Sequence, residues 1–284
     1  MDVGIGLPIA APDTLRTWAE CAEAGPFSTL GLLDRLVYDN PEPLITLAVL
    51  AGATSCIRVQ TEVLLAPLRD TALLAKQAAT LDRMTGGRLV LGLGIGGRDD
   101  DHQVTGIEKN TRGRRLDEQM AVLRRLWSGE PYGDDIGPIG PAPARPGGPE
   151  VLFGGFRTAA IERVARWGDG FLAAVAPSSA GLMGGLFDTA RRFWKEYGRV
   201  GEPRIVAQVN VALGSDDVVH DARSNMRAYY AFLGTADQMV AGMLTTPTEI
   251  RAALAEFADL GADEVMLYCH GVDPHQVDRL AELL

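Results

Sequence analysis

Residues 85–106, TGGRLVLGLGIGGRDDDHQVTG, contain a short apolar run with glycines on both sides. An apolar run of this length between glycines predicts a buried strand. The glycines within and after it, Gly92, Gly94, Gly96 and Gly97, carry no Cβ, so a flat or charged ligand can approach the main chain. The stretch therefore predicts a strand of an α/β enzyme whose carboxyl end binds a ligand.

The same glycines satisfy the spacing G-x-G-x-x-G of the dinucleotide-binding fingerprint. That fingerprint requires its third glycine to open an amphipathic helix, with an acidic residue about twenty positions later at the end of the next strand. Here the polar run RDDDHQVTG follows instead, and Asp117 and Glu118 lie in a helical pattern. We therefore do not expect a Rossmann nucleotide site.

The composition of the 284 residues limits the classes of partner. The chain is 46% hydrophobic, which is enough for a sizeable core, and its net charge of −10 argues against nucleic acid and anionic membrane surfaces as partners. The first residues lack the basic and long apolar segments of a signal peptide, and no apolar run reaches transmembrane length. The three scattered cysteines do not make a disulfide framework. We expect a soluble, cytoplasmic protein.

Apolar runs alternate with helical patterns along the whole chain. The expected strands span residues 3–8, 27–33, 57–65, 88–93, 150–153, 170–176, 204–213 and 264–270. The main expected helices span residues 13–25, 43–54, 71–84, 116–127, 158–167, 185–197, 221–232, 235–244, 248–260 and 274–284, the first with Asp13 as its N-cap. Residues 131–149, rich in Pro and Gly, are expected to form a long excursion without an element. Eight such units predict one domain, 1–284, with the α/β fold of a (β/α)8 TIM barrel.

In such a barrel the functional groups lie at the carboxyl ends of the strands. The expected ends are Leu7-Pro8, Asp34-Arg35, Glu62-Val63, Gly94 to Gly97, Gly154 to Arg157, Ala176-Pro177, Asn210 and Cys269-His270. No histidine pair marks a metal site, and no Gly-x-Ser-x-Gly marks a nucleophile. His102 beside Asp99 to Asp101 suits a cation, although a solvated acidic loop is the simpler interpretation. Asp34 and Glu62 form a pair that glycoside chemistry could use, but few aromatic side chains accompany them.

A second glycine signal is FGGFRT, residues 153–158, where a strand runs into a helix. The free N–H groups of a first helical turn, the Thr158 hydroxyl and the Arg157 guanidinium together favour an anion. A tight turn that needs glycine only for its geometry is the alternative. Together, the two glycine regions suit a planar ring and a phosphate.

Two long blocks resemble the bacterial luciferase-like family of flavin- and deazaflavin-dependent oxidoreductases: LLAKQAATLDRMTGGRLVLGLGIGGRDDDHQVTG, 73–106, and VLFGGFRTAAIERVARWGDGF, 151–171. Residues 32–54 and 59–70 are similar to its second and third strand regions. The resemblance implies a cis peptide at Glu62-Val63 that supports the ring from behind. Together with the two glycine regions, it predicts a cofactor-binding set of Leu7, Glu62, Val63, Gly94, Gly96, Gly97, Gly154, Gly155, Phe156, Arg157 and Thr158, the last five at the phosphate.

The resemblance also implies an acid at Asp34 beside the substrate, while three positions depart from the family. Arg35 stands where many members have histidine, Gly97 stands where members have glutamate or tryptophan, and His102 replaces a usual aromatic. We therefore do not expect sugar-phosphate oxidation.

We predict an oxidoreductase in which reduced deazaflavin (coenzyme F420) transfers hydride to or from an unsaturated small-molecule substrate. Asp34, Arg35 and His102 are the candidates for proton transfer. The Ala/Gly/Arg-rich composition and the range of the family favour the deazaflavin. The alternatives are an FMN-dependent monooxygenase using reduced flavin, a catalytically silent cofactor-binding barrel and a hydrolytic barrel enzyme. The almost entirely apolar helices 43–54 and 71–84 suggest a homodimer interface.

Overall fold

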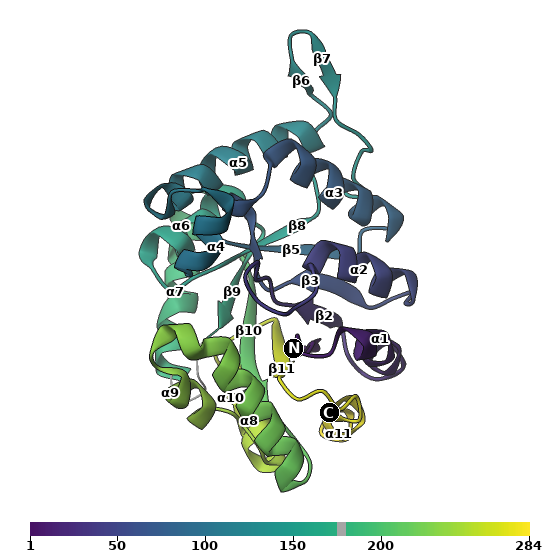
Figure 1. The fold of residues 1–284 in the computed structure, drawn as a ribbon. Coiled ribbons are helices and arrows are strands. Elements are labelled where there is room, and N and C mark those ends of the chain that lie inside the picture. The colour runs from purple at the N-terminus through teal and green to yellow at the C-terminus, as the bar shows by residue number, and fades with distance from the viewer. Residues whose placement is uncertain (175–179) are drawn as a thin grey trace.

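The computed structural model describes residues 1–174 and 180–284, and its centre is a closed barrel of parallel strands surrounded by helices (Figure 1). Its strands are β1 (Asp2–Gly6), β2 (Thr29–Leu32), β3 (Arg58–Thr61), β4 (Leu64–Leu65), β5 (Leu89–Gly94), β8 (Glu150–Gly154), β9 (Gly170–Ala174), β10 (Arg204–Val211) and β11 (Glu264–Cys269). The order is β3-β2-β1-β11-β10-β9-β8-β5-β4, and pairing of β3 with β5 closes the ring. The predicted (β/α)8 barrel is confirmed, because β3 and β4 occupy one position of the eight.

The helices form the outer layer of the barrel. They are α1 (Leu15–Ala24), α2 (Pro43–Gly52), α3 (Thr71–Met84), α4 (Asp99–Thr105), α5 (Arg112–Trp127), α6 (Thr158–Trp167), α7 (Ala180–Glu196), α8 (Asp216–Tyr230), α9 (Ala236–Ala241), α10 (Pro247–Asp259) and α11 (Gln276–Ala281). Caps fix several starts: the Asp70 side chain accepts from Leu73 N at α3, and Thr246 and Glu249 form a capping box at α10. No helix within the described ranges is both long and apolar enough to cross a membrane.

Three local expectations need correction or fall outside the structure. Residues 131–149 do contain an element, a small exposed hairpin of β6 (Pro131–Gly133) and β7 (Ile136–Pro138) that projects from the barrel (Figure 1). Asp13 is not an N-cap, because it lies inside the short 3-10 helix Pro12–Thr14 that precedes α1. The predicted strand end Ala176-Pro177 lies outside the described residues.

The expected third strand, 57–65, is interrupted by a bulge at Glu62 and Val63. Gln60 pairs with Val90 and Leu64 pairs with Leu93, so four steps along this segment match three steps along β5. One extra residue on one of two paired strands is the definition of a β-bulge. The peptide bond between Glu62 and Val63 is cis, as the resemblance implies.

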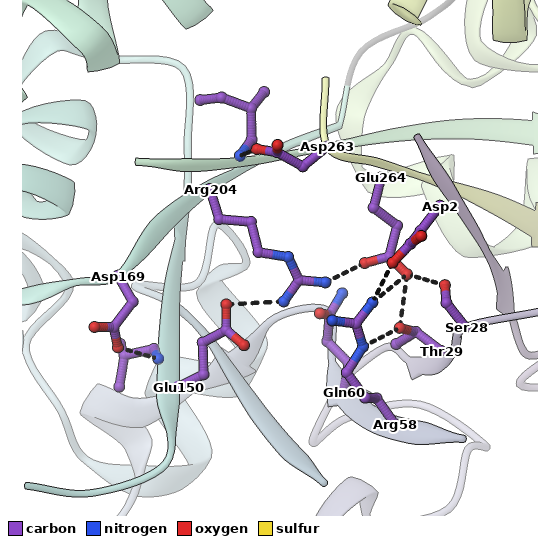
Figure 2. Close-up of polar contacts among 12 residues, drawn as sticks. Asp2, Ser28, Thr29, Arg58, Gln60, Glu150, Asp169, Arg204, Asp263 and Glu264 are labelled. Carbon is purple, nitrogen blue, oxygen red and sulfur yellow. Dashed lines mark hydrogen bonds and ion pairs between the residues drawn. The ribbon is translucent and has the colours of Figure 1, made fainter. Parts of the chain in front are cut away.

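The amino ends of the strands are closed by charged side chains (Figure 2). Arg204 of β10 pairs with Glu150 of β8 at 2.8 Å and with Glu264 of β11, and Glu264 also accepts from Thr29 of β2 at 2.6 Å. Arg58 of β3 reaches the same Glu264 at 3.4 Å. Since every one of these residues is at or next to the first residue of its strand, charged side chains fill the barrel interior at this end.

Candidate functional site

We call the carboxyl ends of the barrel strands the mouth, and the side chain of Val63 joins its two glycine regions. A Cβ added at Gly154 would lie 2.9 Å from Val63 Cγ1, and one added at Gly94 would collide with Val63 Cγ2. Both glycines therefore make room for the same side chain. The ends of β5 and β8 thus lie side by side around Val63, and the two glycine regions open into one mouth.

Beyond β5, the chain turns through Gly96, whose φ of +72° is in the left-handed region, and Gly97 into α4. A Cβ at Gly97 would meet no atom of the described residues within 4 Å, so space is open there. The interpretation of residues 99–101 as a solvated loop is wrong, because they open helix α4 and Asp101 is only 1% exposed. Asp101 accepts from the backbone of Leu36 at 3.1 Å and Val37 at 2.7 Å, which ties α4 to the loop after β2.

His102 of α4 is 3% exposed and faces the glycine turn. Its Nε2 would lie 3.3 Å from a Cβ on Gly96. Neither ring nitrogen has a hydrogen-bond partner among the described residues. A buried imidazole always carries at least one N–H, and an unsatisfied buried polar group costs about 1–3 kcal/mol. The His102 ring is therefore positioned to form a hydrogen bond with a ligand that enters the mouth.

Asp34 follows β2 and is held by protein groups. Its Oδ2 accepts from Leu65 N at 2.9 Å and from Arg69 Nη2 at 2.7 Å. Burial raises the pKa of this carboxyl, and the Arg69 charge opposes the shift. Asp34 also lines a cavity of about 150 Å³ with Arg69 and Glu42. The two acids that sequence analysis paired have separate donors: Leu65 N and Arg69 for Asp34, and Gln60 for Glu62.

Arg35 connects the loop after β2 to α8. Its guanidinium donates to the carbonyls of Tyr229 at 3.2 Å and Val37 at 3.1 Å. It also lies over the rings of Tyr38, at 4.5 Å, and Tyr229, at 5.2 Å. These contacts draw the long connection between β10 and β11 toward the β2 side of the mouth.

Aromatic side chains at the mouth are the residues that the sequence did not reveal. Tyr229 packs edge-on against Tyr38 at 5.6 Å and against Tyr230 at 4.8 Å. His270, at the end of β11, lies 6.2 Å from Tyr230, and its Nε2 is 2.9 Å from Asn210 Oδ1. Burial lowers the pKa of His270 to about 4, so its ring is neutral at physiological pH. Tyr229 and Tyr230 end a helix far from any strand end, so no local pattern places them here.

The turn after β8 has the form that the anion hypothesis requires. Gly155 has a φ of +149°, and α6 begins at Thr158 without a side-chain cap from Arg157. Gly154 and Gly155 are half-buried, while Phe156, Arg157 and Thr158 are exposed. An uncapped helix start offers free N–H groups to an anion. Leu7, at the end of β1, is fully buried and donates its N–H to Gly31 at 2.8 Å.

The closed ring of eight strands, with charged side chains at its amino end and glycines at its mouth, is a (β/α)8 barrel, and enzymes with this fold carry their active sites at the carboxyl ends of the strands. The sequence pattern of the luciferase-like monooxygenase family matches residues 2–264. The chain belongs to that family, which confirms the resemblance seen in residues 73–106 and 151–171 and supports an enzyme.

Individual relatives and solved structures agree with this assignment. A protein of Mycobacterium tuberculosis is 30% identical over 183 residues, which cover 54% of this chain and 62%, less than two thirds, of that protein. An F420-dependent secondary alcohol dehydrogenase, solved with an F420–acetone adduct, has a TM-score of 0.82 at 18% identity and covers 100% of this chain and 98% of its own. The oxygenating constituent of a Pseudomonas putida diketocamphane monooxygenase with FMN has a TM-score of 0.79 at 16% identity, over 100% and 96%. At these identities the structural likeness establishes the fold.

Proposed function

We propose that this protein is an oxidoreductase that uses reduced deazaflavin (coenzyme F420) for hydride transfer to or from an unsaturated small organic substrate. The observation that carries the proposal is the packing of Val63 against Gly94 and Gly154. This packing places the glycine end of β5 and the uncapped start of α6 in the same mouth. The first leaves room for a planar ring, and the second offers N–H groups to its anionic tail.

The residues of the mouth fit such a cofactor. Val63 and the glycines of β5 would lie behind the ring, and Gly97 leaves open space beside it. The turn Gly154 to Thr158 would hold the phosphate through backbone N–H groups and the exposed Arg157. Leu7 would pack from the end of β1. When bound, the ring supplies or accepts the hydride, and the protein supplies orientation, exclusion of water and the proton.

His102 is the best-placed of the three proton-transfer candidates. Reduction of a carbonyl by hydride requires a proton at the oxygen, and a general acid must have a free donor. The His102 ring nitrogens are buried and have no partner in the described part of the chain. The Asp34 carboxyl is held by Arg69, and the Arg35 guanidinium by Tyr229 and Val37. We therefore assign proton transfer to His102. Asp34 and Arg35 would instead position the loop after β2 at the mouth.

An FMN-dependent monooxygenase is the second candidate. The family description and the FMN-bound structural relative favour it. The F420-bound relative and the available acid at His102 favour the deazaflavin. Both cofactors present a ring and a phosphate, so the same mouth serves either one.

Binding titrations distinguish the two cofactors. Purified protein is titrated with F420 and with FMN, and quenching of tryptophan fluorescence reports the dissociation constant. We expect F420 to bind, and about tenfold weaker binding in Arg157→Ala because a phosphate contact is lost. Arg166→Ala is the control, since Arg166 lies in the last turn of the same helix and pairs with Glu162. Binding of FMN but not F420 would reverse the choice, and binding of neither would overturn the proposed function.

We further propose that the protein is a cytoplasmic homodimer. Helices α2 and α3 expose Ile45, Val49, Leu73 and Met84, and they border a largely apolar groove of about 400 Å³. Helix α2 has no charged residue. An apolar surface of this kind is typical of an interface between subunits. A second copy related by a two-fold axis would cover it.

A further inference from the structure

Three buried polar side chains lie inside the barrel beneath the mouth, and we call them the inner cluster: Gln60, Glu62 and Tyr268. Gln60 Nε2 donates to Glu62 Oε1, and the Glu62 carboxyl lies against Gly31, where a Cβ would stand 2.5 Å from Oε1. Tyr268 of β11 is the neighbour of Glu62 and packs over Gly6. Glycines at two neighbouring strands thus make room for the carboxyl and the phenol.

One polar atom of each residue in the inner cluster has no hydrogen-bond partner among the described residues: Gln60 Oε1, Glu62 Oε2 and the Tyr268 hydroxyl. An ionised Glu62 could only accept. Gln60 Nε2 donates to it, and the Tyr268 hydroxyl beside it is a second available donor. A neutral Glu62 gains an O–H that the Tyr268 oxygen can accept instead, so hydrogen bonding suits either form and the surrounding charges decide between them.

Among the described residues, no cation forms an ion pair with Glu62. Arg204 of β10 is held by Glu150 and Glu264, and Glu264 of β11 is itself an acid. Strand β2 contributes Gly31, and β3 contributes the uncharged Gln60. A buried carboxylate without a paired cation is costly, so the group takes up a proton. Burial, opposed by the Gln60 hydrogen bond, raises the pKa of Glu62 to about 8.

Glu62 directly precedes Val63, the side chain that joins Gly94 and Gly154 at the mouth. We propose that Glu62 is a positioning residue: it admits a reduced, anionic ring to the mouth only while its own carboxyl is neutral. A second negative charge below the ring would repel it, whereas the neutral acid leaves the barrel interior uncharged. This inference rests on the proposed function, because it needs a ring that binds at Val63.

The first test uses cofactor-free protein. Infrared spectra across a pH series should show the carbonyl stretch of a neutral carboxylic acid at about pH 7, fading with a midpoint near 8. Glu62→Gln should remove this band, while Asp82→Asn, which changes a buried acid at the far end of α3, should leave its midpoint unchanged. A Glu62 that is already ionised at pH 7 overturns the inference.

The second test measures binding of reduced F420 and reduced FMN, titrated anaerobically at about pH 7 and about pH 9. Wild-type protein should bind the reduced ring about tenfold more weakly at the higher pH, and Glu62→Gln should show no such loss. Oxidised FMN, whose ring is neutral, should bind equally at both values. If a reduced ring binds and the variant shows the same pH dependence as wild type, the inference is wrong. If no ring binds under any condition, the proposed function itself fails.

Discussion

Arg35 Nε lies 3.8 Å from Asp101 Oδ2, and the two side chains are 4% and 2% exposed. This ion pair joins the loop after β2 to helix α4, and Asp101 also accepts the N–H groups of Leu36 and Val37. Arg35 in turn donates to the Tyr229 carbonyl of α8. One buried carboxylate therefore holds together three segments that are far apart in the sequence.

Asp101→Ala should destabilise the protein by about 3 kcal/mol, because removing one partner of a buried pair leaves the other charge and two N–H groups unsatisfied. Urea unfolding followed by circular dichroism measures the loss. Asp99→Ala is the control, since Asp99 is exposed and water screens its pair with Lys109, so its stability should stay close to that of the wild type. Equal stability of the two variants would contradict this account of the mouth.

Gly94→Ala should destabilise the protein by about 1–3 kcal/mol, because its methyl group would enter the space of Val63. Val63→Ala removes the methyl groups that would collide. The double variant Val63→Ala/Gly94→Ala should therefore lose less stability than the sum of the losses in the two single variants. Thermal unfolding of the four proteins measures the coupling. Additive effects would show that Val63 does not occupy the space above Gly94.

The free energy of unfolding should depend on pH through Glu62. The folded-state pKa of Glu62, about 8, is above the ordinary value of 4.5. The contribution of Glu62 to the free energy of unfolding is therefore fully present below about pH 4.5. It is lost as pH rises to about 8, by about 1.4 kcal/mol per pH unit, because the folded state holds a proton that the unfolded state has released. Glu62→Gln should remove this dependence, which urea titrations between pH 5 and 9 can measure. If the wild-type protein and Glu62→Gln showed the same pH dependence of unfolding, the prediction would be wrong.

His102→Phe should lower the turnover number by about 10²–10³-fold, because the ring shape is kept while the proton-transfer group is lost. Turnover is followed as oxidation of reduced F420 by a carbonyl substrate. The dissociation constant of the cofactor should change by less than about twofold. His275→Phe, at the exposed start of α11, serves as the control. Full activity of His102→Phe would transfer the proton-donor role to another group.

Ile45→Glu should convert the dimer to a monomer, because it places a charge on the apolar surface of α2. Light scattering at micromolar concentration measures the mass. Ile136→Glu, on the exposed hairpin, replaces another exposed isoleucine outside this surface and should leave the dimer intact. A wild-type protein that is monomeric at this concentration would refute the interface.

Much of the architecture follows from local patterns. Apolar runs between glycines predicted the barrel strands of the described residues, and helices 71–84 and 158–167 were predicted to the residue. Strand order in a parallel barrel then follows from the alternation itself, so the positions of Asp34, Glu62, Gly94 and Gly154 at one end were foreseeable. The cis peptide at Glu62-Val63 was expected from the family resemblance alone, and the bulge around it is visible only against the register of β5.

The sequence by itself determined the barrel and the end at which its two glycine regions lie, because hydrophobic periodicity and glycine placement act between neighbours along the chain. Only the tertiary structure decided which polar groups are free and which are held. Asp34, Arg35 and His102 looked equivalent as candidates, yet Arg69, Tyr229 and Val37 engage the first two, and the third has no partner in the described residues. Those partners come from distant segments, so burial and pairing, and with them the charge state of Glu62, emerge only when the chain is folded.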